Sequence, residues 1–188
     1  MYNERNELIT KQEWYKRRAA EGAFGEQMII NHFISKGYEI TQSSSTQSNW
    51  DIKVKKDGIE KSYEIKANFN EYLKDEIHPL TVTEVATDIW DPITRKMITK
   101  PSGISVSKAD YWIIYYPFEN IFYIEETKIV KTYMSYGIRK RGGRDNNAIL
   151  RLVSREHFTN KEDLSFMDYY DDNMAKEHWW QWYNNKNK

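Results

Sequence analysis

The fold is decided by residues 49–68, which read Asn49-Trp-Asp-Ile-Lys-Val-Lys-Lys-Asp-Gly-Ile-Glu-Lys-Ser-Tyr-Glu-Ile-Lys-Ala-Asn68. The Asp57-Gly58 pair predicts a two-residue hairpin turn, because both residues tolerate positive φ and β-branched or aromatic residues alternate on either side. Counting back from this turn places Asp51 opposite Glu64. Side chains alternate between the faces of a strand, which gives an apolar face (Ile52, Val54, Ile59, Tyr63, Ile65) and a polar one (Asp51, Lys53, Glu60, Ser62, Glu64, Lys66).

The opposed carboxylates of Asp51 and Glu64 predict a cation site. Directly opposed residues have Cβ atoms about 4.5–5.5 Å apart, where two carboxylates repel unless a cation or a shared proton lies between them. We expect Mg²⁺ or Mn²⁺, because hard cations take oxygen ligands and keep coordination sites for water and phosphate. Lys66 follows on the same face, where its ammonium could orient a metal-bound water or offset charge on a phosphate.

Residues 10–36 predict one long helix, opened by a Thr10-x-x-Glu13 capping box and closed by Gly37. At about 100° per residue, one face carries the stripe Tyr15, Ala19, Gly22, Ala23, Glu26, Ile29, Ile30 and Phe33. Glu26 lies mid-stripe, where a carboxylate is costly unless it is paired, protonated or bound to a metal. We expect Glu21 on the opposite side, in solvent. The alternative is that Glu26 only reaches the edge of the interface, because Phe24 and Met28 form a second apolar face.

The hairpin resembles the motif of the PD-(D/E)XK, restriction-endonuclease-like nucleases, with Asp51 as the first acid and Glu64-Ile65-Lys66 as the (D/E)xK triplet. Those enzymes often have Pro before the Asp, and here a Trp has that place. Many members add a Glu from the first helix, and the resemblance assigns that role to Glu26. It implies that Asp51, Glu64 and the Ile65 carbonyl bind the metal and that Lys66 acts on water. A solvated strand face with alternating charges is the alternative.

A second element extends this resemblance to about residue 117. The segment Ser107-Lys-Ala-Asp-Tyr111 precedes the apolar run 111–116, and together they resemble the element after the motif in phage-type and Holliday-junction-resolvase-like members. The resemblance implies that Lys108 lies near the site and contacts phosphate. A lysine in a solvated turn is the alternative.

Composition bounds the function further. A chain of 188 residues predicts a single domain, with a core at about 10–155 and an aromatic extension at 156–188. The absence of Cys excludes disulfides, thiolate zinc sites and cysteine nucleophiles, and it fits a reducing cytoplasm. The four His residues lack metal-ligand spacing, and no run of about 18 apolar residues predicts a membrane span.

The net charge is zero, but residues 128–161 hold nine basic residues and two acidic ones, a net charge of +7. Their densest cluster is Arg139, Lys140, Arg141 and Arg144, in a glycine-containing loop that we expect to contact DNA phosphates. A solvated hairpin loop is the alternative. The aromatic segment 178–183 is expected to dock on the core or on a second subunit, in preference to stacking on bases.

The remaining pattern predicts strands at 38–41, 81–85, 111–116, 121–124 and 149–153, a turn at 90–95 and a helix at 125–136. We expect an α/β domain of restriction-endonuclease-like type, with a central mixed sheet that strand 149–153 closes, flanked by helices. The expected activity is metal-dependent endonucleolytic hydrolysis of DNA, with junction or branched DNA as a candidate substrate. Junction resolvase, restriction-type endonuclease, nickase and exonuclease stay open, as do a non-catalytic DNA-binding or assembly module and a structural protein. Cutting two strands favours a homodimer.

Overall fold

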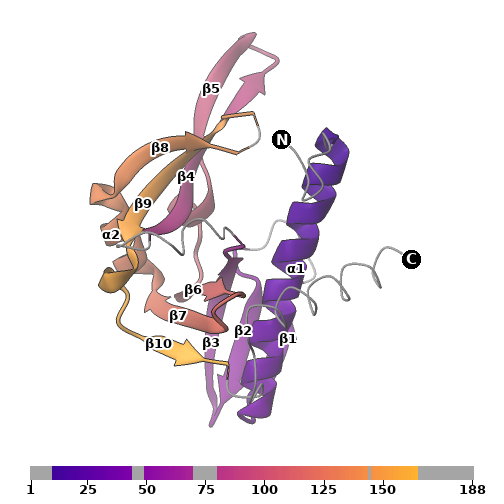
Figure 1. Cartoon of the computed structure of the whole chain (residues 1–188), viewed down its shortest axis with the longest axis vertical. Helices are drawn as coiled ribbons and strands as arrows, with labels where there is room; N and C mark the ends of the chain where they lie inside the picture. The colour runs from indigo at the N-terminus through magenta and orange to yellow at the C-terminus, as the bar shows by residue number, and fades with distance from the viewer. Residues whose placement is uncertain (1–9, 44–48, 70–79, 144, 165–188) are drawn as a thin grey trace.

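A long helix and two β-sheets make up the structure (Figure 1), a computed structural model that describes residues 10–43, 49–69, 80–143 and 145–164. Helix α1 (Lys11–Ser35) packs along a six-stranded sheet, and a four-stranded sheet extends beyond it. Helix α2 (Thr127–Tyr136) lies on the side away from α1. None of the helices in these ranges is long and apolar enough to cross a membrane.

The six-stranded sheet is the predicted central mixed sheet, which is confirmed. Its order is β1 (Glu39–Gln42), β2 (Ile52–Lys56), β3 (Ile59–Ala67), β6 (Tyr111–Tyr116), β7 (Ile121–Glu126) and β10 (Lys161–Asp163). Strands β3 and β6 pair in parallel, and the other neighbours pair antiparallel. The predicted helix start at Glu125 is wrong by two residues, because Glu125 and Glu126 still pair with β6.

The second sheet differs from the sequence prediction. Its order is β5 (Lys96–Pro101), β4 (Leu80–Asp91), β9 (Ala148–Ser154) and β8 (Ile138–Gly142), and all pairs are antiparallel. Strand 149–153 therefore does not close the central sheet, because it pairs with β4 and β8. Strand β4 runs past the predicted 81–85, so the predicted turn at 90–95 begins only after Asp91. Short 3-10 turns, η2 (Gly103–Ser105) and η3 (Arg155–His157), complete the described structure.

Strand β6 separates two hydrophobic cores. Ile113 and Tyr115 pack with α1 in the first core, whereas Trp112, Ile114 and Tyr116 pack in the second with α2 and β9. All five side chains are at most 5% exposed. A strand buried on both faces needs a continuous apolar run, which explains the sequence at 111–116.

The predicted capping box of α1 is present. The Thr10 hydroxyl accepts a hydrogen bond from the Glu13 amide at 3.1 Å, and the Glu13 carboxylate accepts one from the Thr10 amide at 2.8 Å. Gly37 follows the helix with a φ of 79°, a value that favours glycine.

The predicted buried stripe of α1 is wrong in part. Ala19 and Ala23 are exposed, whereas Phe24 and Met28 are buried, because larger apolar side chains gain more from leaving water. Glu21 is also buried, at 4% exposed, and not in solvent as predicted. Two neighbours on its own helix compensate its charge: Arg17 Nε lies 3.1 Å and Arg18 Nη1 2.6 Å from its carboxylate.

The hairpin forms with the predicted turn. Asp57 and Gly58 have φ values of 52° and 78°, as a type I′ turn requires. The ladder then runs from Lys56 opposite Ile59 to Ile52 opposite Tyr63. The predicted apolar face is buried only toward the far end, because Ile59, next to the turn, is 64% exposed.

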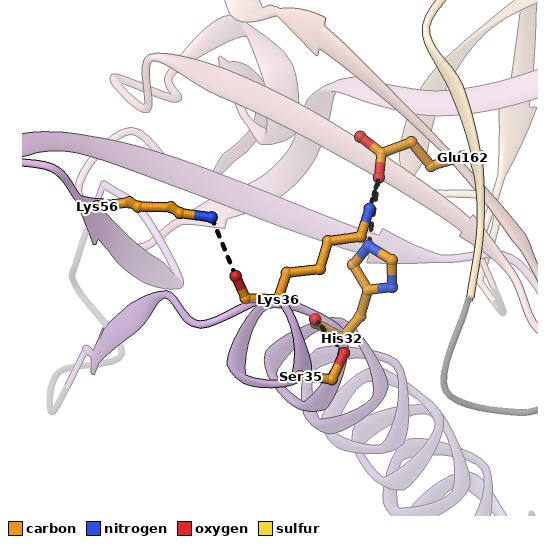
Figure 2. A network of polar contacts seen from close by, with 5 residues as sticks. All are labelled: His32, Ser35, Lys36, Lys56 and Glu162. Carbon is orange, nitrogen blue, oxygen red and sulfur yellow. Dashed lines mark hydrogen bonds and ion pairs between the residues drawn. The ribbon is translucent and has the colours of Figure 1, made fainter.

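A polar network holds the C-terminal end of α1 to two strands of the central sheet (Figure 2). Lys36 Nζ lies 2.7 Å and His32 Nε2 3.2 Å from the same Glu162 oxygen on β10. Lys56 of β2 donates to the Lys36 carbonyl at 3.1 Å. Burial, followed by the charge of Lys36, lowers the pKa of His32, so this imidazole is neutral at pH 7.

Gly25 determines how closely α1 approaches β3. A Cβ built at Gly25 would overlap the Ala67 Cβ, and it would lie 3.6 Å from the Tyr115 ring. Only the absence of a side chain permits this contact. Gly22, one turn earlier, has no atom within 4 Å of the position that a Cβ would occupy, and it offers a matched control.

Gly25→Ala should lower the free energy of unfolding by about 1–3 kcal/mol, because the added methyl overpacks the interface with β3. Gly22→Ala should raise it by roughly 0.5–1 kcal/mol, because alanine favours an unobstructed helix position. Urea denaturation of both variants and the wild-type protein measures the difference. Equal effects of the two substitutions would contradict the close approach at Gly25.

Candidate active site

Asp51 lies at the open end of the hairpin, one residue before β2. Its amide donates to the Tyr63 carbonyl at 2.9 Å, although Ile52 is the register partner of Tyr63. Two consecutive residues thus face one, as in a β-bulge. The predicted direct pairing of Asp51 with Glu64 is therefore wrong. The bulge turns the Asp51 carboxylate onto β3, where its Oδ2 accepts a hydrogen bond from the Ile65 amide at 2.7 Å.

Glu64 and Lys66 point from β3 to the same face. The Lys66 ammonium donates to Glu64 Oε1 at 2.5 Å. The Glu64 side chain is 14% exposed and that of Lys66 is 48% exposed, so solvent reaches the pair mainly through the lysine. Beneath them lies Trp112 of β6, whose ring centroid is 5.6 Å from Lys66 Nζ. The aromatic face and the Glu64 carboxylate together hold the ammonium in place.

Glu26 reaches this cluster from α1, because Gly25 brings the helix against β3 beside Ala67. Burial and then repulsion from Asp51 raise the pKa of Glu26 from 4.5 to about 6, with a smaller contribution from Glu64 and an opposing one from Lys66. These mutual effects require the four charged groups to lie near one another. The structure therefore places Glu26 within electrostatic range of the hairpin residues that the sequence singled out.

The electrostatics of Lys66 follow from the same cluster. Desolvation lowers the pKa of its ammonium, but attraction to Glu64, Asp51 and Glu26 outweighs this effect, and the pKa lies above the ordinary lysine value. Lys66 is thus protonated at neutral pH.

The Ile65 carbonyl points to the same side of β3 as Asp51. The amide and carbonyl of one strand residue share a direction, and the Ile65 amide donates to Asp51. The ladder with β2 ends at the Ile52–Tyr63 pair, so it assigns Ile65 no partner residue.

The donor set fits a hard divalent cation that keeps several waters. Within the described ranges, no three His, Cys, Asp or Glu side chains form a ready-made ligand cluster. Mg²⁺ needs fewer protein ligands, since it usually binds through one or two carboxylates together with water and phosphate. Burial is the main cause of the raised pKa of Glu26, and the repulsion from Asp51 adds to it; a divalent cation would offset that repulsion.

Sequence reasoning missed Asp110, which fixes the start of β6 against β3. Its Oδ2 accepts hydrogen bonds from the Ser62 amide at 2.8 Å and the Ser62 hydroxyl at 2.9 Å, and its own amide donates back to that hydroxyl at 3.0 Å. The bond from the Ser62 amide is the largest cause of the lowered pKa of Asp110. This clamp sets the β3–β6 register and thereby places Trp112 under Lys66. In the sequence, the feature that could have indicated this role is the position of Asp110 directly before the apolar run 111–116.

The residues predicted to contact phosphate lie in two places, beside the open end of the hairpin and on strand β8. The Lys108 amide donates to the Asn49 carbonyl at 3.4 Å, which puts Lys108 beside the open end of the hairpin. Arg139, Lys140 and Arg141 lie on the edge strand β8, so the predicted loop is wrong for these residues. Arg141 is ion-paired with Asp88, whereas Arg144 and the aromatic segment 178–183 lie outside the described residues.

Comparisons with known proteins give a distant structural similarity. The chain matches no protein-family model and no curated protein. A solved structure described as that of a bacterial homing endonuclease, I-Ssp6803I, aligns with 68% of this chain and 86% of its own, at a TM-score of 0.46 and 17% identity.

Glu26→Gln should stabilise the metal-free protein at high pH. A raised carboxyl pKa means that its contribution to stability is fully present below pH 4.5 and is lost as pH rises through about 6. The Gln amide cannot ionise, so the variant avoids this loss of stability. For a pKa change from 4.5 to about 6, the loss in the free energy of unfolding amounts to roughly 2 kcal/mol.

The measurement is urea denaturation in EDTA at pH 4, 6 and 8. Between pH 4 and pH 8 the free energy of unfolding of Glu26→Gln should rise relative to that of the wild-type protein. Glu60 is exposed and ion-paired with Lys53, and Glu60→Gln should show no such rise. A difference between Glu26→Gln and the wild-type protein that does not change with pH would show that the Glu26 carboxyl is not perturbed.

Proposed function

We propose that the protein is a divalent-metal-dependent DNA endonuclease that hydrolyses phosphodiester bonds. The observation that carries this proposal is the meeting of Glu26 from α1 with Asp51, Glu64 and Lys66 of the hairpin. Three carboxylates lie within electrostatic reach of one ammonium and leave an excess of negative charge, and such a site would suit Mg²⁺ or Mn²⁺ in phosphoryl chemistry.

Asp51 and Glu64 would hold the ion, with the Ile65 carbonyl as a third ligand and Glu26 as support for a ligand or a second ion. Bound there, the ion would supply Lewis-acid chemistry, polarising the phosphate and lowering the pKa of a water. The hydrogen bond from the Ile65 amide orients the Asp51 carboxylate. Lys66 would orient the attacking water and offset phosphate charge. Its raised pKa argues against a role as the base, because the ammonium keeps its proton at neutral pH.

DNA would be held by basic residues outside the carboxylate cluster. Arg139, Lys140, Arg141, Arg144 and Lys108 are the proposed phosphate contacts. Of the β8 residues, Arg139 and Lys140 are exposed and best suited, since Arg141 is held by Asp88 and donates to the Asn146 carbonyl at 3.3 Å. Cleavage of both strands would call for two sites, which a homodimer supplies.

Asp51→Asn, Glu64→Gln and Lys66→Met should each reduce metal-dependent cleavage by more than about 100-fold, since even changes behind a metal's ligands cost roughly 10–100-fold. DNA binding should be largely retained, because other residues hold the backbone. The assay is a panel of linear, single-stranded, flapped and four-way-junction DNA with and without Mg²⁺. Glu60→Gln, on the same strand and exposed, is the matched control and should cut normally.

Two results would overturn this proposal. Wild-type cleavage rates in the Asp51 or Glu64 variants would show that the site is elsewhere. A wild-type protein that binds DNA and cuts no member of the panel would be a non-catalytic DNA-binding module.

The β8 residues should contribute to binding through phosphate contacts. Neutralising Arg139 and Lys140 to Gln should flatten the slope of log affinity against log salt by up to about 0.9 per lost contact. Lys96→Gln/Lys100→Gln is the matched control, because both lysines are exposed on β5, the opposite edge of the same sheet. Binding is measured by fluorescence anisotropy in EDTA. A slope that stays the same in the β8 variant, or falls equally in the control, would move the DNA path away from β8.

A further inference from the structure

A lysine-walled groove opens where β6 and α2 begin, along β3. Its volume is about 570 Å³, and β3, the segment before β6 and the start of α2 line it. Four lysines contribute to the walls, namely Lys61, Lys108, Lys128 and Lys131, against two acids, Asp110 and Glu126. The walls therefore carry a net positive charge, unlike the carboxylate cluster.

The contacts within the groove leave two of these cations available. Glu126 is paired with Lys128 at 2.5 Å, and Lys131 donates to the Ser107 carbonyl at 2.8 Å. Asp110 is engaged by Ser62. Among the residues that the structure describes, the ammonium groups of Lys61 and Lys108 have no hydrogen-bond or ion-pair partner, and both residues are exposed.

The start of α2 adds a further positive feature. The amides of the first turn of any helix lack an intrahelical acceptor, and here the N-cap residue, Glu126, makes no side-chain capping bond to them. The Thr127 amide itself donates to the Asp110 carbonyl at 3.0 Å. Thr127 lines the groove, is only 5% exposed, and its hydroxyl has no partner among the described residues. The helix start and the lysines together favour an anion with several acceptor oxygens.

We propose that this groove binds a backbone phosphate of the DNA, on the strand next to the bond that is cut. This inference rests on the proposed nuclease function and names a second phosphate position for it. The connection to the cluster is direct, because the Lys108 amide bonds to the carbonyl of Asn49, two residues before Asp51. Ser62, on the same face as Glu64, is held by Asp110 of the groove wall. These two contacts join the groove wall to the hairpin that carries Asp51 and Glu64.

The test compares Lys61→Gln/Lys108→Gln with Lys55→Gln/Lys161→Gln, which neutralises two exposed lysines of β2 and β10 that do not line the groove. Binding of duplex DNA is measured by anisotropy in EDTA across a salt series. The groove variant should lose up to about 1.8 from the salt slope, at roughly 0.9 for each of two phosphate contacts, and the control should match the wild-type protein. An unchanged slope in the groove variant would overturn the inference.

A second measurement identifies the source of the phosphate. Lysine acetylation of the wild-type protein, read by peptide mass spectrometry, should show protection of Lys61 and Lys108 by duplex DNA and none of Lys55 and Lys161. Inorganic phosphate at matched ionic strength should protect neither pair. Equal protection by DNA and by inorganic phosphate would overturn the assignment to a DNA backbone in favour of a small-anion site.

These measurements contain no divalent metal and do not depend on cleavage. A protein that shows groove protection by DNA but no nuclease activity would contradict the proposed function and leave the DNA groove supported. A protein that cuts DNA without protection of Lys61 and Lys108 would contradict the groove alone.

Discussion

The contact between α1 and β3 at Gly25 and Ala67 is the constraint on which the site depends. The helix backbone at Gly25 packs directly against the small Ala67 side chain, and the next residue along the helix is Glu26. A helix packed at an ordinary side-chain distance would hold the Glu26 carboxylate away from Asp51 and Glu64. The same close approach lets Phe24, Met28 and Ile29 fill the first core. The packing of α1 against β3 and the position of Glu26 therefore both depend on Gly25.

Among the residues that the structure describes, the cluster holds more negative charge than positive charge. The Lys66 ammonium contacts Glu64 and attracts Asp51 and Glu26 at longer range, and partial burial strengthens these interactions. Glu26 responds with a pKa of about 6 and Lys66 with a raised one. The carboxyl of Glu26 and the ammonium of Lys66 therefore have perturbed pKa values at one place, as is common at functional sites. Elsewhere the buried acid Glu21 is ion-paired with two arginines.

Local chemistry was readable from the sequence, and long-range pairing was not. The Thr10 capping box, the Asp57-Gly58 turn and the hairpin register depend on neighbouring residues, and they formed as expected. The bulge at Asp51 did not follow from counting, because a register counted from the turn assumes an uninterrupted ladder.

Other features depend on partners that are far apart in sequence. Strand β9 lies outside the central sheet because it pairs with β4. Trp112 lies under Lys66 because of the parallel register of β3 with β6. The buried face of α1 was decided by side-chain size, since the expected stripe gave small alanines the same weight as Phe24 and Met28. The four site candidates could be named from sequence because their spacing is local to one helix and one hairpin.

Strand β6 contributes side chains to both hydrophobic cores, so the stability of each sheet depends on the other. Detaching the second sheet would uncover Trp112 and Ile114, while detaching α1 would uncover Ile113 and Tyr115 on the other side of the same strand. Detachment of either α1 or the second sheet would expose a large apolar surface on β6, which also packs against the other layer. The molecule is therefore expected to melt as one cooperative unit, so that damage to the distant β4–β9 pairing lowers the occupancy of the intact hairpin cluster.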